Sequence, residues 1–241
     1  MSAFAIVFGN VKRGKQEERL MERHQAVFRG GSGEITEKKS RFIAHVQSVK
    51  TVEEAQQFIE EMKKKYWDAR HNCSAFSVGV THPLTRCSDD GEPGGTAGKP
   101  ILEVIQGSGI RNIVIVVTRY FGGTLLGTGG LVRAYTDAAK EGIAGSVLIE
   151  KIPGRRYALE TDYTDLGKIQ YILAQNQIII EETVYTDKVK IHTLIPEESK
   201  GRLLKALTEA TGGRVQAAEE EEVYFGLAEG QVQIYPLEEE E

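Results

Sequence analysis

The sequence predicts an α+β protein built from two domains. Its 241 residues are 40% hydrophobic, which is enough apolar material for two cores of ordinary size. The composition changes at residues 151–156, where the pair Pro153-Gly154 is typical of a turn or linker. Beyond this point the hydrophobic pattern predicts the order β-α-β-β-α-β, the ferredoxin-like split pattern. The predicted parts are a flexible N-terminal arm over 1–23 and domains over 24–150 and 155–236.

The first domain is expected to mix strands and helices. Thr51 and Glu54 have the spacing of a capping box, so a helix is expected to begin at Thr51. Residues 112–118 are β-branched nearly throughout and predict a strand that is buried on both faces. Further strands are expected within 24–35, 41–49 and 73–80, further helices at 100–105 and 131–143, and a loop or the start of a helix over 81–100.

The charge is divided unevenly along the chain. Residues 1–150 contain 20 basic and 17 acidic side chains, a net charge of +3, whereas 151–241 contain 10 and 18, a net charge of −8. The C-terminal acids include Glu219–Glu222 and Glu238–Glu241, which would repel phosphate. Any affinity for nucleic acid is therefore expected in the first domain. Aromatic residues are scarce around its basic positions in the sequence, so stacking on single strands is not strongly indicated.

The expected location is the cytoplasm. No run of about 18 apolar residues is present, so no membrane span is expected. The opening run Ala3–Phe8 is short and has no basic residue before it, unlike a signal peptide. The two cysteines, Cys73 and Cys87, are too few for a disulfide framework, which favours a reducing compartment.

Two glycine-rich segments, Ser88–Pro100 and Arg119–Leu131, are the strongest candidates for a ligand site, although neither matches a standard nucleotide-binding motif. Each precedes an expected helix, and a helix start with unpaired backbone N–H groups attracts phosphate. The alternative is that the glycines serve only tight turns and close packing. The candidate anion-binding residues are Asp89, Asp90, Gly91, Glu92, Gly95, Thr96, Gly98, Lys99, Arg119, Tyr120, Gly122, Gly123, Gly127, Gly129, Gly130 and Arg133.

The two segments are expected to meet in space and to form one concave site. The strand over 112–118 would deliver the second segment to one rim of the domain, and ligands in open α/β sheets gather where loops leave strand ends beside helix starts. The first segment precedes the expected helix at Pro100, so it would supply a second set of free N–H groups. The alternative is two separate turns on opposite sides of the domain.

The titratable residues near these segments leave several alternatives open. Asp89, Asp90 and Glu92 would either hold a divalent metal through oxygen ligands, or cap the next helix and pair with the arginines of the second segment. His71 and Cys73 lack the further ligands of a zinc site. They would be either a nucleophilic pair or structural residues. No cofactor and no resident metal are predicted.

The same segments carry a family resemblance. The motifs SDDGEPGGTAGKP and RYFGGTLLGTGGLVRAY, together with residues 33–35, 39–43 and 68–73, closely resemble the IMPACT/YigZ family over about residues 24–148. The resemblance implies a first domain similar to the second domain of ribosomal protein S-five. It also implies a ferredoxin-like second domain, similar to the last domain of the translocation elongation factor, for which the expected order of elements over 155–226 matches.

The resemblance implies a role connected with translation. The eukaryotic relative acts in translational control by competing for an activator of a starvation-responsive kinase, and both folds recur in proteins that contact RNA. The leading expectation is a non-enzymatic protein that binds nucleic acid such as RNA, the ribosome or a translation factor and acts in the regulation of translation. The alternatives are an enzyme or sensor for a phosphorylated small molecule held at the glycine-rich segments, and a protein-interaction module with no anion site.

Overall fold

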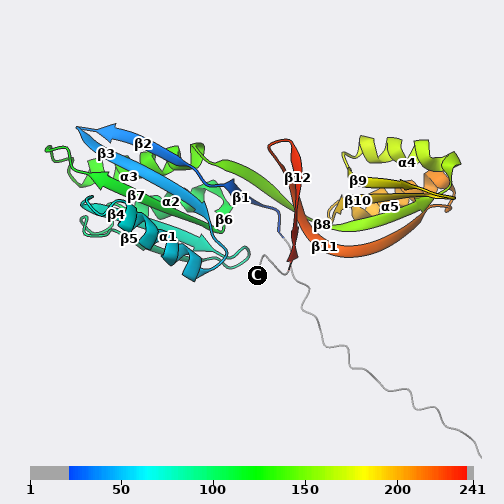
Figure 1. The fold of residues 1–241 in the computed structure, drawn as a ribbon, viewed down its shortest axis with the longest axis horizontal. Coiled ribbons are helices and arrows are strands. Elements are labelled where there is room, and N and C mark those ends of the chain that lie inside the picture. The colour runs from blue at the N-terminus through cyan, green and yellow to red at the C-terminus, as the bar shows by residue number, and fades with distance from the viewer. Residues whose placement is uncertain (1–21, 238–241) are drawn as a thin grey trace, which may run out of the picture.

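The structure is a computed structural model that describes residues 22–237. Residues 1–21, which form most of the predicted N-terminal arm, and 238–241 lie outside this range. The fold is an α+β arrangement of two domains, as predicted (Figure 1). Within the described part of the chain, no helix is long and apolar enough to cross a membrane.

The first domain is built around a five-stranded sheet in the order β2-β3-β7-β4-β5. Its strands are β2 (Ser32–Glu37), β3 (Ser40–Ser48), β4 (His71–Val78), β5 (Leu84–Ser88) and β7 (Ile113–Tyr120), each antiparallel to its neighbours. Helix α1 (Val52–Lys65) covers one face of the sheet, and α2 (Gly98–Ser108) and α3 (Thr128–Ala144) cover the other (Figure 1). The sheet is therefore the middle layer of three.

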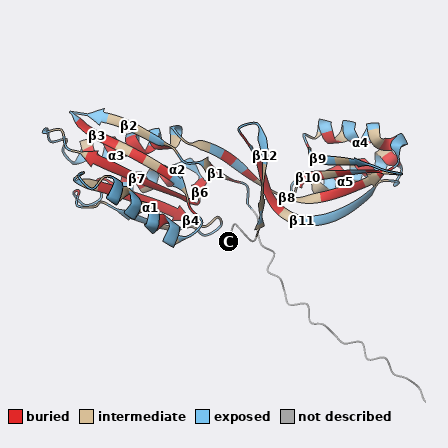
Figure 2. Cartoon of the chain, in the orientation of Figure 1, coloured by how far each residue is buried: buried red, intermediate tan, exposed pale blue. Residues whose placement is uncertain are grey.

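The central strand β7 is buried on both faces, as its composition predicts (Figure 2). Ile115 and Val117 pack in the core beneath α2 and α3, while Val114 and Val116 pack in the core beneath α1. Each of these aliphatic side chains contributes about 1.5–3 kcal/mol through its burial. A strand held this firmly fixes the position of the loop that leaves its end.

The helix start at Thr51 is confirmed, although the Glu54 carboxylate bonds one residue before the N-cap and so does not complete a standard capping box. The hydroxyl of Thr51 accepts a hydrogen bond from the N–H of Glu54 at 3.1 Å, and the Glu54 carboxylate accepts one from the N–H of Lys50 at 2.6 Å. Three lysines, Lys63–Lys65, occupy the last turn, where cations stabilise the negative end of the helix dipole. The same lysines therefore arrive together at the end of the domain where α1 stops.

The second domain has the predicted β-α-β-β-α-β order. The strands lie side by side as β9-β10-β8-β11, all antiparallel, with a core formed against the two helices. Its elements are β8 (Val147–Thr161), α4 (Tyr163–Gln175), β9 (Ile179–Tyr185), β10 (Val189–Pro196), α5 (Lys200–Thr211) and β11 (Gln216–Ala228).

The prediction of an exposed linker at residues 151–156 is wrong. These residues lie in the middle of β8, which pairs with β1 (His24–Arg29) at one end and with β10 and β11 at the other. Gly154 permits the crowding there, because a side chain at this position would lie 2.4 Å from the carbonyl oxygen of Ile195. One strand is thus shared by both domains. A fragment ending at Ser146 would lose the antiparallel partner of β1.

Three strands have no counterpart in the sequence-based prediction. β5 lies within 81–100, where a loop or helix start was expected, and β6 (Ile110–Arg111) forms a two-residue parallel pairing with β1. β12 (Gln231–Pro236) returns along β11 as the outer strand of a hairpin. All three are short and lack the continuous apolar pattern that made β7 recognisable.

Candidate functional site

Several connections meet at the end of the first domain that points away from the second domain (Figure 1). β7 ends at Tyr120, and its antiparallel neighbours begin beside it, with Arg41 of β3 opposite Tyr120 and His71 of β4 opposite Arg119. We name this end the distal tip. It consists of the turn at 38–39, the connection at 66–70, the first glycine-rich segment at 89–97 and the loop at 121–127.

Asp89 caps the N-terminus of α2. One carboxylate oxygen accepts hydrogen bonds from the N–H groups of Ala97 and Gly98 at 3.0 and 2.8 Å, and the other accepts one from Gly95 at 2.8 Å. Burial raises the pKa of Asp89, but the three backbone hydrogen bonds outweigh it and hold the pKa below its usual value. The capping alternative is therefore confirmed. The expectation that these N–H groups are free for phosphate is wrong, because a carboxylate of the chain already occupies them.

Replacing Asp89 with alanine should destabilise the protein by about 2 kcal/mol, because three backbone donors lose a charged acceptor. Asp89→Asn should cost less, since its amide oxygen still accepts. The pKa of Asp89 is depressed on folding, so its contribution is complete above about pH 4 and is lost as the pH falls through the folded-state pKa. Urea unfolding at pH 7 and pH 3 measures both effects. An alanine variant as stable as the wild type at pH 7 would contradict the capping role.

Glu92 forms a buried ion pair with Arg119. The Nη1 group of Arg119 donates to Glu92 Oε1 at 2.6 Å, and the hydroxyl of Tyr135 donates to the same oxygen at 2.9 Å. The side chains of Glu92 and Arg119 are only 3% and 7% exposed. The pairing alternative is confirmed for Glu92. Arg119 is already paired with this carboxylate inside the protein.

The ion pair also joins the two glycine-rich segments. Glu92 belongs to the first segment and Arg119 begins the second, so the prediction that the segments meet is confirmed through their side chains. The guanidinium carbon of Arg119 lies 5.4 Å from the ring centre of Phe42 and 5.6 Å from that of Phe121. Its Nε is buried and has no hydrogen-bond partner among the described residues. The junction is a packed polar core, and anion binding by these residues stays a prediction.

His71 and Cys73 do not form a nucleophilic pair. The Nδ1–H of His71 donates to the carbonyl oxygen of Asp90 at 2.8 Å, while the thiol of Cys73 donates to the carbonyl oxygen of Asp89 at 2.9 Å. Burial raises the pKa of Cys73 far above its usual value, so the thiol stays protonated. Both side chains instead hold the first glycine-rich segment against β4, which is the structural alternative.

Asp90 is also occupied within the protein. One of its carboxylate oxygens accepts a hydrogen bond from the N–H of Asn72 at 2.7 Å, and the other lies 3.9 Å from Lys63 Nζ. Asp90 adopts a φ of +44° and is followed by Gly91 at +85°, which turns the chain sharply beside His71. Between residues 22 and 237, no three His, Cys, Asp or Glu side chains are grouped as a metal site requires. The metal alternative therefore has no support in the geometry.

The second glycine-rich segment is tied to the turn at Lys38–Lys39. A side chain at Gly122 would lie 2.0 Å from the carbonyl carbon of Lys39, and the N–H of Gly122 donates to the Ser40 hydroxyl at 3.1 Å. Gly127 has a φ of +73° and precedes α3 without a side-chain cap. The loop therefore needs glycine for a close approach at one end and for a left-handed conformation at the other.

The remaining predicted residues divide between interior and solvent. Thr96 is buried and donates to the carbonyl oxygen of Pro93, whereas Lys99 and Arg133 are exposed on α2 and α3.

Tyr120 donates its hydroxyl to Asp68 at 2.8 Å, and the guanidinium carbon of Arg41 lies 5.9 Å from the ring centre of Tyr120. Gly123 has a positive φ, and a side chain at Gly129 would meet nothing within 4 Å, while one at Gly130 would lie 3.0 Å from Leu126.

Aromatic side chains lie beside cations at the distal tip, within the run KKKYWDAR and at the end of β7, which sequence reasoning missed. Trp67 is 81% exposed and follows the lysines that end α1. Phe121 is 43% exposed and follows Tyr120 at the end of β7, and the Tyr120–Asp68 hydrogen bond joins the two loops. The scarcity of aromatic residues around basic positions therefore does not hold in space at the distal tip. Hydrophobic periodicity identifies helices and strands, and it gives no information about a single aromatic residue in a loop.

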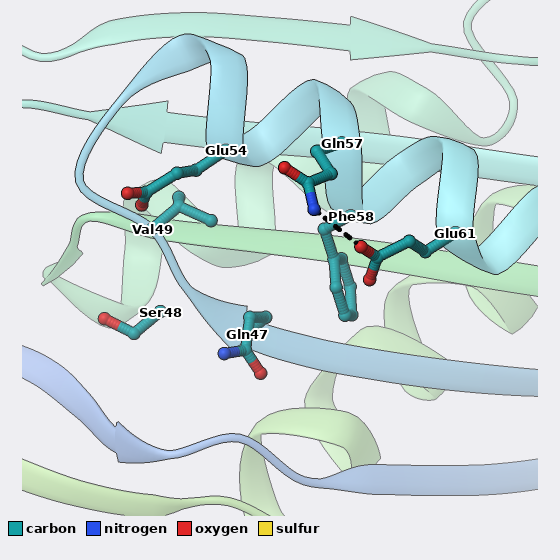
Figure 3. Close-up of a pocket in the computed structure, with 7 residues that line it drawn as sticks. All are labelled: Gln47, Ser48, Val49, Glu54, Gln57, Phe58 and Glu61. Carbon is teal, nitrogen blue, oxygen red and sulfur yellow. Dashed lines mark hydrogen bonds between the residues drawn. The ribbon is translucent and has the colours of Figure 1, made fainter.

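Two hollows lie outside the distal tip. One, of about 320 Å³, lies between α1 and the end of β3, where Glu54 and Glu61 line it together with Phe58 (Figure 3). The other, of about 560 Å³, lies between α2 and α3 and is lined by residues such as Val104, Ile143 and Ala144. Neither contains any of the predicted site residues, and the carboxylates of the first make it unsuited to an anion.

Comparison with known proteins matches both domains. The family model described as the Impact N-terminal domain matches residues 38–143, and the one described as a domain of unknown function, DUF1949, matches residues 159–214. A crystal structure described as that of an hypothetical protein is 35% identical, with a TM-score of 0.54, and the match covers 84% of this chain and 99% of that one.

Curated relatives match over most of their length. IMPACT family member YvyE of Bacillus subtilis is 39% identical over 209 residues, which are 87% of this chain and 96% of the relative. IMPACT family member YigZ of Escherichia coli is 37% identical over 181 residues, which are 74% of this chain and 89% of the relative. With both of its domains matched in this way, the chain belongs to the IMPACT family.

Proposed function

We propose that the protein binds RNA through the distal tip of its first domain, in a role connected with translation. The supporting observation is that exposed cations of the tip have no acidic partner, while the acids of its connections are occupied. Cations in and beside the tip that are exposed and have no ion-pair partner among residues 22–237 are Lys38, Lys39 and Arg70 in its connections, Lys64 and Lys65 at the end of α1, and Arg133 on the second turn of α3.

The acids of the tip's connections form no ion pair with these cations. Its connections contain four: Asp68 accepts from Tyr120, Asp89 caps α2, Asp90 accepts from Asn72, and Glu92 pairs with Arg119. A set of exposed cations without ion-pair partners, close to exposed aromatic rings, fits a polyanion whose bases offer flat faces.

The second domain supports the same assignment by contrast. Glu219, Glu221 and Glu222 of β11 lie against Arg155 and Arg156, so the arginines there are already paired with carboxylates. The net charge of −8 over 151–241 disfavours phosphate at that end of the molecule. The two ends of the chain therefore differ in the partner that each would attract.

A salt titration tests the proposal. With four to six phosphate contacts, the affinity for a short hairpin RNA should fall by about 10² to 10³ between 50 and 200 mM salt. Replacing both Lys64 and Lys65 with alanine should remove about two phosphate contacts, so the plot of log affinity against log salt concentration should become less steep by that amount. The matched control replaces Arg202 and Lys205, two exposed cations on α5, and should leave binding unchanged. Absence of salt-sensitive binding at tens of micromolar protein, or equal losses in the two variants, would refute the proposal.

A further inference from the structure

We propose that Trp67 is a stacking platform for an unpaired base, so that the RNA favoured by the distal tip carries a single-stranded loop, bulge or overhang. This inference rests on the proposed function and adds the class of RNA. Trp67 is the sole tryptophan of the chain and is 81% exposed. Stacking of a base on an aromatic side chain needs such an accessible ring face. It also needs an unpaired base, because a base within a duplex is already stacked on its neighbours.

The backbone that carries Trp67 is fixed on both sides. Before it, the ring of Tyr66 stacks on His45 with centres 5.3 Å apart, and the Tyr66 hydroxyl lies 2.6 Å from His45 Nε2. After it, Asp68 accepts the hydroxyl of Tyr120 at 2.8 Å. The N–H of Ala69 donates to the carbonyl oxygen of Tyr66 at 3.0 Å and closes a turn around Trp67 and Asp68. The turn anchors its two neighbours to the sheet and leaves the indole in solvent.

Cations lie on both sides of this turn. Lys64 and Lys65 end α1 just before it, and Arg70 follows it directly before β4. Lys65 Nζ lies 5.2 Å from the Tyr66 ring centre, and the guanidinium carbon of Arg41 lies 5.9 Å from the ring centre of Tyr120. A nucleotide stacked on Trp67 would therefore have positive charge near the phosphates before and after it, which is the usual arrangement in single-strand binding proteins.

The local sequence favours a base over a membrane as the occupant. Anchoring in a lipid interface uses several apolar side chains on one face of an element. Here the connection and the preceding turn read KKKYWDAR, and the Tyr66 hydroxyl is bonded inward to His45. Within the connection at 66–70, Trp67 is the one large apolar side chain that is exposed, while Phe121 and Leu125 are exposed on the loop at 121–127. Binding to anionic lipid is the outcome that the experiment must separate.

The experiment compares two RNAs of equal length, a blunt duplex hairpin with a minimal loop and a hairpin with a long single-stranded extension. Trp67→Ala should weaken binding of the extended RNA by about 5- to 100-fold and change the duplex affinity by less than twofold. Trp67→Phe, which keeps a ring, should restore most of the affinity. Tyr171→Ala, at a 65% exposed aromatic residue of α4, is the matched control and should have no effect. In the wild type, the extended RNA should quench Trp67 fluorescence more than the duplex does.

Each other outcome has a definite meaning. Equal losses for both RNAs, or no loss for either, would overturn the stacking role of Trp67 while leaving RNA binding itself intact. Salt-insensitive or undetectable binding of both RNAs by the wild type would refute the proposed function and this inference with it. A blue shift of Trp67 fluorescence with phosphatidylserine vesicles, without any response to RNA, would assign the tip to a membrane surface instead.

Discussion

Replacing Arg119 with methionine should destabilise the first domain by about 3–5 kcal/mol, because it leaves the carboxylate of Glu92 buried without its cation. Glu92 would retain the hydroxyl of Tyr135, which donates to it at 2.9 Å, and the ring of His71, whose Nε2 lies 3.9 Å from its Oε1. The change also removes the guanidinium that lies between the rings of Phe42 and Phe121. Urea unfolding followed by circular dichroism gives the change in the free energy of unfolding.

The double variant Arg119→Met/Glu92→Gln separates the contribution of the ion pair to stability from the contribution of side-chain packing. It removes the stranded charge, so it should be more stable than the single Arg119 variant, with a coupling of about 2 kcal/mol. The matched control is Arg86→Met on the exposed edge strand β5, which should change stability by about 0.5 kcal/mol or less. An Arg119 variant within that range would show that the buried pair does not hold the two glycine-rich segments together.

Replacing Lys38-Lys39 with Asn-Gly should stabilise the protein and weaken its binding to RNA. The two lysines form a two-residue hairpin turn between Glu37 and Ser40 and have φ values of +46° and +67°. Two consecutive positive φ values are typical of a type I′ turn, for which Asn-Gly is the favoured sequence. Residues other than glycine lose about 1–2 kcal/mol each in this left-handed region. We expect a net gain of about 1–2 kcal/mol in the free energy of unfolding.

The same substitution removes two cations of the distal tip. The slope of log affinity against log salt concentration should decrease by the equivalent of about two phosphate contacts. The affinity for RNA at low salt should drop by roughly tenfold. Lys38→Arg/Lys39→Arg, which keeps the charge and the strained backbone, should change neither stability nor affinity strongly. A variant that binds RNA as the wild type does, or that loses stability, would contradict this account.

Another hairpin of the protein offers an internal comparison for this turn. The hairpin between β11 and β12 also has a two-residue turn with positive φ, at Glu229 and Gly230. There the second position is glycine, which takes the left-handed conformation without steric cost. The distal tip instead carries lysine at both positions. Strain retained at a turn is typical of positions selected for something other than stability.

Much of the fold could be predicted from local patterns. The β-branched run that became β7 has an unambiguous pattern, as do the capping residues of α1 and the alternation of elements after Tyr157. The continuity of β8 could not be predicted, because Pro153-Gly154 is typical of a turn. Only the tertiary structure reveals that Gly154 is needed where β8 runs past Ile195 and Phe225.

The candidate site was predictable in composition but not in the roles of its residues. The chemistry of Asp89 and Glu92 admitted capping, pairing or metal binding, and the choice depended on which N–H groups and cations the fold placed beside them. The exposure of Trp67 had no signal at all, since it follows from a turn anchored by distant residues His45 and Tyr120. Long-range contacts decide such features, and they are not encoded in spacing along the chain.

Photo-crosslinking of the full chain to a hairpin RNA with a single-stranded extension, followed by mass spectrometry of the peptides, tests the central claim most directly. We expect crosslinked peptides from the distal tip, above all those containing Trp67 and the turn at Lys38–Lys39, with yields that fall as salt rises. Crosslinks confined to the acidic second domain, over 155–236, would contradict the assignment of RNA binding to the tip.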